Sequence, residues 1–63
     1  MDASYFLLIS LDTATFEVPE LELYRFEQYS DLWQFLQDEL FQNAIRWYQI
    51  YWGDVLMMQK LIK

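Results

Sequence analysis

The stretch IRWYQIYWGDVLMMQKLI, residues 45–62, decides the fold, because two different structures fit it. If its first half continues a helix that begins upstream, Gly53 ends that helix as its C′ residue and Asp54 caps a short final helix. If its β-favouring aromatic residues instead form a strand, Gly53 and Asp54 turn a hairpin into a second strand over 55–62. The first interpretation predicts one long helix, and the second predicts a ββαββ order with a C-terminal hairpin.

The residues before this stretch favour the helix. Ser30 is a good N-cap, and Asp31 follows it in the first turn, where the helix dipole favours an acid. Apolar residues then recur at spacings of three and four, and polar residues run down the opposite side with the same spacing. We therefore expect a helix over about 31–52, with the ββαββ order as the alternative. The apolar row is Trp33, Leu36, Leu40, Ala44, Trp47 and Tyr51, and the polar row is Gln34, Asp38, Gln42, Arg46 and Gln49.

The N-terminal part predicts two or three antiparallel strands. Residues 4–11 are rich in aromatic and aliphatic side chains, which suits a strand buried on one or both faces. Residues 15–18 alternate as a half-buried strand does, and Pro19 marks an edge or a break. Alternation then resumes, with Leu21 and Leu23 on one face and glutamates on the other. The expected fold is α+β, with a small antiparallel sheet packed on a long amphipathic helix in a single domain over 1–63.

The composition predicts association with another chain. A chain of 63 residues hides only about 60% of the surface that its unfolded form exposes. Yet 56% of the residues are hydrophobic and 21% are aromatic, so a monomer has more apolar surface than it can bury. Without cysteine or histidine, neither disulfides nor the common transition-metal sites can stabilise the fold. We therefore expect a homodimer or a complex with a partner.

The residue inventory argues against catalysis. Nucleophilic triads need a base that is usually histidine, and this chain has none. Gly53 is the only glycine, so no glycine-rich loop can hold phosphates. Carboxylate pairs such as Glu20 with Glu22 need a cleft that a domain this small can hardly form. We expect no enzyme activity, no cofactor and no metal.

The acids are concentrated in one part of the chain. Between residues 12 and 39 there are eight acids and one base, Arg25, so this segment carries a net charge of −7, while three bases and one acid follow from residue 40 onward. A charge run is usually a solvated face. The sharper interpretation is that carboxylates about 6.6 Å apart on a strand imitate a phosphate backbone and compete for a basic groove. Direct nucleic-acid binding is then disfavoured. The candidate partner-binding surface is Asp12, Glu17, Glu20, Glu22, Glu27, Asp31, Asp38 and Glu39.

The aromatic residues form a second candidate surface. On the expected helix the apolar arc is wider than one small sheet can cover, and Trp and Tyr commonly anchor interfaces. The candidate oligomer or docking residues are Trp47, Tyr48, Tyr51 and Trp52. Two functions follow as hypotheses: a stoichiometric inhibitor that blocks a basic nucleic-acid-binding groove, or an assembly or adaptor subunit that docks through its aromatic residues.

In size, acidity and aromatic content the chain resembles small virus- or phage-encoded inhibitors of host enzymes. Anti-CRISPR proteins, anti-restriction DNA mimics and uracil-DNA glycosylase inhibitors are examples. The resemblance covers no motif, and it implies an inhibitor that acts in the host cytoplasm. The apolar run over residues 5–11 is too short to span a bilayer and follows Asp2 rather than a base, so we expect a cytoplasmic protein without a membrane segment. Because the chain starts at Met1 without a visible tag, we expect a complete small gene product.

Overall fold

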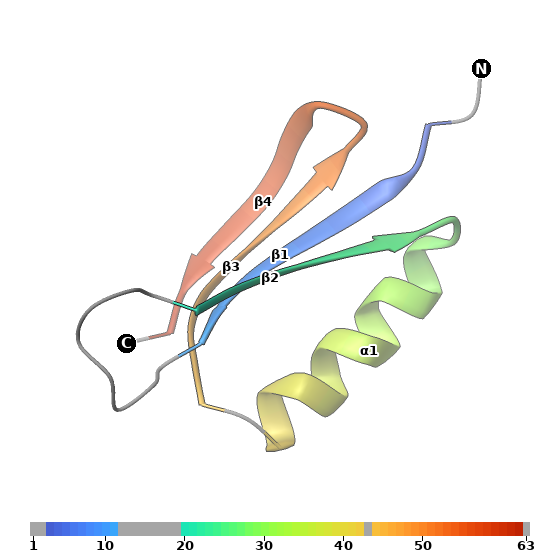
Figure 1. The fold of residues 1–63 in the computed structure, drawn as a ribbon. Helices are drawn as coiled ribbons and strands as arrows, with labels where there is room; N and C mark the ends of the chain where they lie inside the picture. Colours follow the sequence, from blue (N-terminus) through green and yellow to red (C-terminus); the bar gives the residue numbers. More distant parts are fainter. Residues whose placement is uncertain (1–2, 12–19, 43, 63) are drawn as a thin grey trace.

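The computed structural model describes residues 3–11, 20–42 and 44–62, and it shows one helix on a four-stranded sheet (Figure 1). The sheet order is β2-β1-β3-β4, and each neighbouring pair is antiparallel. The α+β class is therefore confirmed, and the order along the chain is ββαββ. The elements are β1 (Tyr5–Leu11), β2 (Glu20–Phe26), α1 (Tyr29–Gln42), β3 (Ile45–Trp52) and β4 (Val55–Leu61).

The helix lies on one face of the sheet because of the strand directions. Strands β2 and β3 both run antiparallel to β1, which lies between them, so β2 and β3 are parallel to each other. Two parallel strands need a crossover connection, which is usually a helix. Helix α1 is that crossover, and it packs against β1 and β2 (Figure 1).

The core lies between α1 and this face of the sheet. Leu7 and Ile9 of β1, Ile50 of β3 and Leu32 and Leu36 of α1 are fully buried. In β3 the buried residues alternate with half-buried or exposed ones, as expected for a strand, whereas in β1 the neighbours Ile9 and Ser10 are both buried. The four-residue step from Leu32 to Leu36 puts both leucines on the side of α1 that faces the sheet.

The predicted long helix is wrong in its second half, because α1 ends at Gln42. Residues 45–52 are strand β3, and the predicted short C-terminal helix is strand β4. The alternative ββαββ order is therefore correct. The physical reason is long-range pairing: β3 is rich in β-favouring aromatic residues and is hydrogen-bonded between β1 and β4.

Gly53 supports the hairpin between β3 and β4. Its φ is 61°, and no other described residue has a positive φ. A two-residue turn with a positive φ only at its first position is a type II′ turn, and this type suits a strand hairpin and favours glycine there. Gly53 therefore turns a hairpin instead of ending a helix.

Two N-terminal strands are confirmed within the described residues, with bounds close to those expected. The strand expected over residues 15–18 lies outside the described residues, and so does the break at Pro19. Helix α1 begins at Tyr29, two residues before the expected start.

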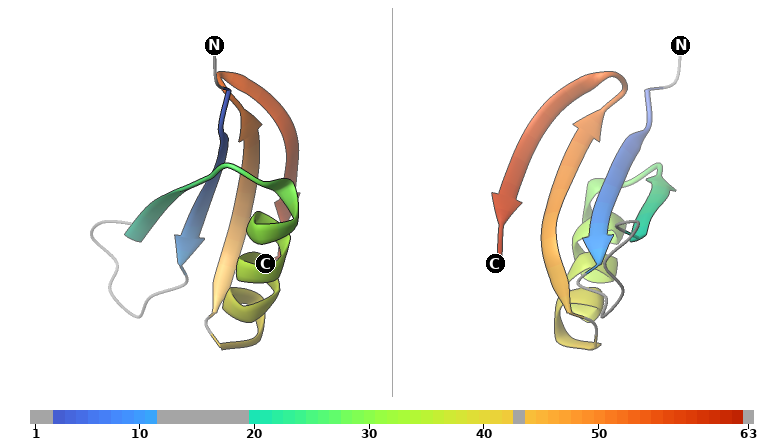
Figure 2. Two further views of the ribbon diagram at one scale, coloured as in Figure 1. Left: turned by 90° about the vertical axis from the view of Figure 1, so that its right-hand side faces the viewer. Right: turned by 60° about the vertical axis from the view of Figure 1, so that its left-hand side comes forward.

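Strand β4 lies beyond the cover of the helix. All of its residues are exposed, including Val55, Leu56, Met57 and Met58. Strand β4 is the edge strand opposite β2, and in the right-hand view of Figure 2 it extends past the side of α1. Within the described residues, the sheet is therefore covered on one face only, and only in part.

Candidate interaction surface

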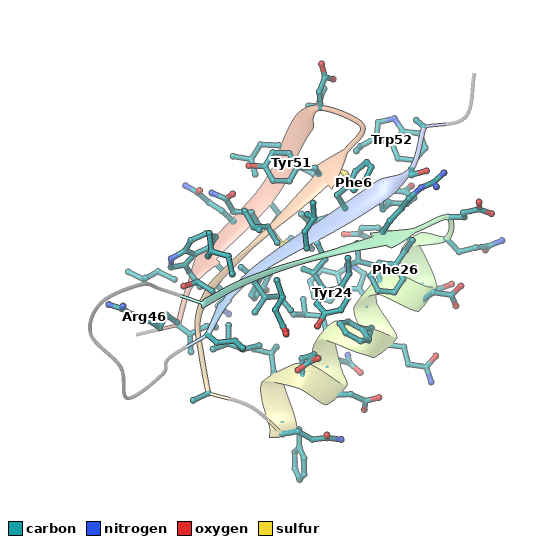
Figure 3. The ribbon with its side chains drawn as sticks, in the orientation of Figure 1. Phe6, Tyr24, Phe26, Arg46, Tyr51 and Trp52 are labelled. Atoms are coloured by element: carbon teal, nitrogen blue, oxygen red, sulfur yellow. The ribbon has the colours of Figure 1, made fainter. Side chains whose placement is uncertain are left out.

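The face of the sheet that is turned away from α1 has no covering layer in the described part of the chain. We call it the open face and define it by strand register: it is made of three rows, each crossing the four strands from β2 to β4. Figure 3 shows Phe6 and Tyr51 on this side, while Tyr24 and Phe26 lie toward α1. The rows are Arg25–Phe6–Tyr51–Leu56, Leu23–Leu8–Gln49–Gln59 and Leu21–Ser10–Trp47–Leu61.

The open face is mainly apolar. Four of its members are leucines on the two edge strands, and two more positions hold Trp47 and Tyr51 on β3. Leu23 is 64% exposed and Leu61 is 71% exposed, so the two edges leave apolar surface in water. Arg25 is the one charged residue among the three rows, and none of the rows contains an acid.

The polar side chains of the open face bond to one another. The Tyr51 hydroxyl donates to Gln49 Oε1 at 2.7 Å, and Gln49 Nε2 donates to Gln59 Oε1 at 3.1 Å. At the end of the sheet, Arg25 Nε donates to Ser4 Oγ at 2.9 Å. Each of these side chains therefore has a protein partner before any second molecule binds.

The first half of β2 has its apolar side chains on the open face. Leu21 and Leu23 point to the open face, while Glu22 is half-buried on the side that faces α1. When one face of an antiparallel sheet is solvated, the usual pattern is apolar toward the core and polar toward water. In the first half of β2 this pattern is reversed, while the second half follows it, with Tyr24 and Phe26 toward α1 and Arg25 outward. Leu21 and Leu23 therefore leave apolar surface on the open face.

The aromatic ring contacts gather on the other side of the sheet, against α1. Tyr5 lies between Tyr29 and Trp52, with ring centroids 5.1 and 4.4 Å apart. Trp33 of α1 contacts Tyr48 of β3 edge to face, at 6.5 Å. These contacts connect the helix to the three strands nearest the core.

The predicted docking residues are therefore divided between two faces. Trp47 and Tyr51 belong to the open face, where both are half-buried. Tyr48 is buried in the core, and Trp52 lies on the α1 side at its rim. The prediction that one helix carries all four is wrong, because residues on a strand alternate between faces.

The described acids lie in the β2–α1 part of the molecule, with Asp54 in the hairpin turn as the exception. Glu27, Asp31 and Asp38 are exposed, and Glu39 is half-buried. Of the other predicted acids, Glu20 begins β2 with its side chain outside the description, and Asp12 and Glu17 lie outside the described residues.

Glu22 makes a specific contact toward α1. The Tyr24 hydroxyl donates to Glu22 Oε1 at 2.7 Å, and Glu39 is also close enough to act on it electrostatically. The hydrogen bond to Glu22, with burial and the two nearby negative charges, raises the pKa of Tyr24 to about 12. This acid is thus engaged inside the protein and is a poor candidate for the surface of a phosphate mimic.

The described residues form shallow hollows on the surface. One hollow lies between β3 and β4 and is lined by Trp47, Gln59 and neighbouring residues, and another lies at the start of β1 around Ser4 and Phe6. Within residues 3–11, 20–42 and 44–62, no three acids come together in a group that could hold a metal ion. The one described helix is too short to cross a membrane.

Comparison with known proteins gave no family: no family model, curated protein or solved structure matches the chain.

Several residues of the open face were not singled out from the sequence as a site. They are Phe6, Leu8, Leu21, Leu23, Leu56 and Leu61. A signal was present in the continuous apolar run of residues 5–9, which is typical of a strand buried on both faces. The second signal was the alternation over 20–23, whose leucines would ordinarily be assigned to the core.

Proposed function

We propose that this chain is a non-catalytic protein-binding module of the assembly or adaptor kind, and that it binds through the open face. The observation that carries the proposal is the reversed pattern in the first half of β2, with Leu21 and Leu23 outward and Glu22 toward α1. A strand of this kind gains from burial of its outer side, at about 25 cal/mol for each Å² of apolar surface removed from water.

The composition of the open face suits a protein partner. Trp47, Tyr51 and Arg25 are residue types that are enriched at protein interfaces and that often contribute most of the binding free energy. Nucleic acid is a poor ligand, because the face has one base and the whole chain carries a net charge of −6.

A matched pair of variants tests this proposal. Leu23→Lys with Leu61→Lys places two charges on the open face at positions that are already well exposed, so the fold should tolerate them. Phe41→Lys, at a position on α1 that is 91% exposed, is the control for an added charge elsewhere. A partner is first identified by affinity purification from the natural host, and its dissociation constant is then measured for each variant.

We expect the double variant to bind the partner at least about tenfold more weakly, and the control to bind as wild type does. Unchanged binding by a correctly folded double variant would refute docking through the open face.

A second candidate function is favoured by the position of the exposed acids. Glu27, Asp31 and Asp38 lie in the β2–α1 part, away from the open face. They support the hypothesis of a stoichiometric inhibitor that blocks the basic nucleic-acid-binding groove of an enzyme, as anti-CRISPR or anti-restriction proteins do. This surface stays available when the open face is occupied.

The salt dependence of binding separates the two candidates. A charge mimic loses affinity steeply as ionic strength rises, and its association rate falls when Glu27→Gln, Asp31→Asn and Asp38→Asn are combined. Docking through the open face has little salt dependence and is unaffected by these three changes. If the triple variant keeps its full association rate with the host partner, the inhibitor hypothesis loses its working surface.

A further inference from the structure

We infer that the occupant of the open face is a second copy of this chain, so that two sheets pack face to face with a helix on each outer side. This inference rests on the proposed binding role of the open face and names the partner as the same chain, so a host protein that binds this face has to displace the second copy. Four observations support it: strands that are apolar on both faces, hydrogen bonds among the polar side chains of the open face, the absence of acids from that face, and the area of the face.

The strands have the sequence of a sheet with both faces covered. On β1, Leu7 and Ile9 fill the core while Phe6 and Leu8 lie on the open face. Runs that are apolar on both faces are typical of strands buried on both sides. Two such sheets stack about 10 Å apart with their strands nearly aligned, and their facing side chains interdigitate.

Covering the open face leaves its polar groups bonded. Tyr51, Gln49 and Gln59 form a hydrogen-bonded chain across β3 and β4. Burying an unpaired polar group is costly, whereas a group that keeps its hydrogen bond loses little. These three side chains can therefore be covered without a polar group supplied by the partner, while Arg25, which is exposed on the edge strand β2 and donates from Nε to Ser4, keeps the rest of its guanidinium in water.

The placement of charge favours a second copy over a charged partner. Each chain carries a net charge of −6, yet no acid lies in the three rows of the open face. A basic partner would find no carboxylate there, and an acidic partner would find Arg25 alone. In a face-to-face pair, the two α1 helices lie on the outer sides of the two sheets. The exposed acids of one α1 are then about 30 Å from those of the other, well beyond the screening length of about 8 Å.

The area is close to what a specific dimer needs. Four strands about 4.8 Å apart and seven residues long give a flat footprint of about 440 Å² for each copy. The two copies together then bury a flat area of about 880 Å², and the uneven surface of the side chains adds to it. A specific interface usually buries at least about 1,000 Å² in total.

The test is the molar mass of the purified chain and its variants, measured by sedimentation equilibrium over a range of micromolar concentrations. The variants are Leu23→Lys with Leu61→Lys on the open face, and Phe41→Lys as the matched control on α1. Near-ultraviolet circular dichroism of each variant checks that the fold is retained. We expect twice the monomer mass for wild type and for the control, and self-association weaker by roughly a hundredfold for the double variant.

Three results would overturn the inference. They are a wild-type monomer at every concentration, a double variant that is folded and still dimeric, and a dimer that is lost in Phe41→Lys alone. The host-partner assay then separates the two proposals. If wild type is a monomer and the double variant still loses its host partner, the second copy is wrong and docking through the open face stands. If the double variant keeps both its dimer mass and its affinity for the host partner, both proposals are wrong.

Discussion

Trp47 and Tyr48 are consecutive residues of β3, yet they lie on opposite faces of the sheet. Trp47 is half-buried on the open face, whereas Tyr48 is 4% exposed and contacts Trp33 of α1 in the core. Substitutions of these neighbours should therefore have different effects. One should weaken association, and the other should weaken the fold.

We predict that Tyr48→Ala lowers the free energy of unfolding by about 3 kcal/mol, because it leaves a cavity between β3 and α1. Trp47→Ser should change the free energy of unfolding of the monomer by much less and should mainly weaken association. Urea denaturation at low protein concentration measures the first effect, and sedimentation measures the second. Equal loss of folding free energy in the two variants would contradict the assignment of faces.

The hairpin turn gives a prediction about backbone conformation alone. A Cβ added at Gly53 meets no atom within 4 Å, so any cost of Gly53→Ala comes from the positive φ. We predict that this variant is less stable than wild type by about 1 kcal/mol. Thermal unfolding measures the change.

D-Alanine at position 53, introduced by chemical synthesis, is the matched control, because it adopts a positive φ without the steric penalty. Its stability should be close to that of wild type. If the D-alanine and L-alanine variants are equally destabilised, the turn conformation is not the cause.

Tyr24 and Tyr48 predict a loss of stability at high pH. The hydrogen bond to Glu22 raises the pKa of Tyr24 to about 12, and burial raises the pKa of Tyr48 above its usual value of 10.0. Between pH 10 and 12 the unfolded chain therefore loses phenolic protons that the folded chain keeps, so the free energy of unfolding falls as pH rises through this window. Below pH 10 this contribution is fully present.

Spectrophotometric titration of the folded protein should show tyrosine ionisation that extends to about pH 12. Glu22→Gln keeps an acceptor oxygen but removes the charge, so it should lower the pKa of Tyr24. Tyr24→Phe should make stability less dependent on pH in the same window. A Glu22→Gln variant whose tyrosine titration is unchanged would show that Glu22 does not act on Tyr24.

The one acid of the first turn of α1 has a modest role in folding. Asp31 lies in the first turn of α1, where a negative charge interacts favourably with the helix dipole. Asp31→Asn should lower the free energy of unfolding by about 0.5 kcal/mol in low salt, and less in high salt. The same change should leave the dimer mass unaltered, because Asp31 lies on α1, away from the open face. A large change in dimer mass would place α1 in the interface.

The N-terminal half of the fold could be predicted from the sequence, and the C-terminal half only as an alternative. The alternation in residues 20–26 and the cap at Ser30 are local signals, and both led close to the observed elements. Residues 45–52 are apolar on both faces, so a helical period and a strand period fit them equally well. Pairing with β1, about forty residues away in the chain, decides that this segment is a strand. The spacing of neighbouring residues carries no information about such a distant pairing.

The candidate site was harder to predict for a related reason. The alternation of Leu21 and Leu23 with glutamates shows which residues share a face, but it does not show which face meets α1. The usual rule would place the leucines in the core, and here the packing of α1 places Glu22 on the inner side. The open face is therefore visible only once the sheet order is known.

Hydroxyl-radical footprinting at increasing protein concentration tests most directly whether a second copy covers the open face. In a single chain Leu23, Leu61 and Phe41 are 64%, 71% and 91% exposed. The oxidation rate of each residue is divided by its value in dilute solution. We predict that Leu23 and Leu61 become protected as the dimer forms, while Phe41 stays fully reactive. If Leu23 and Leu61 remain as reactive in concentrated solution as in dilute solution, the second copy does not cover this face.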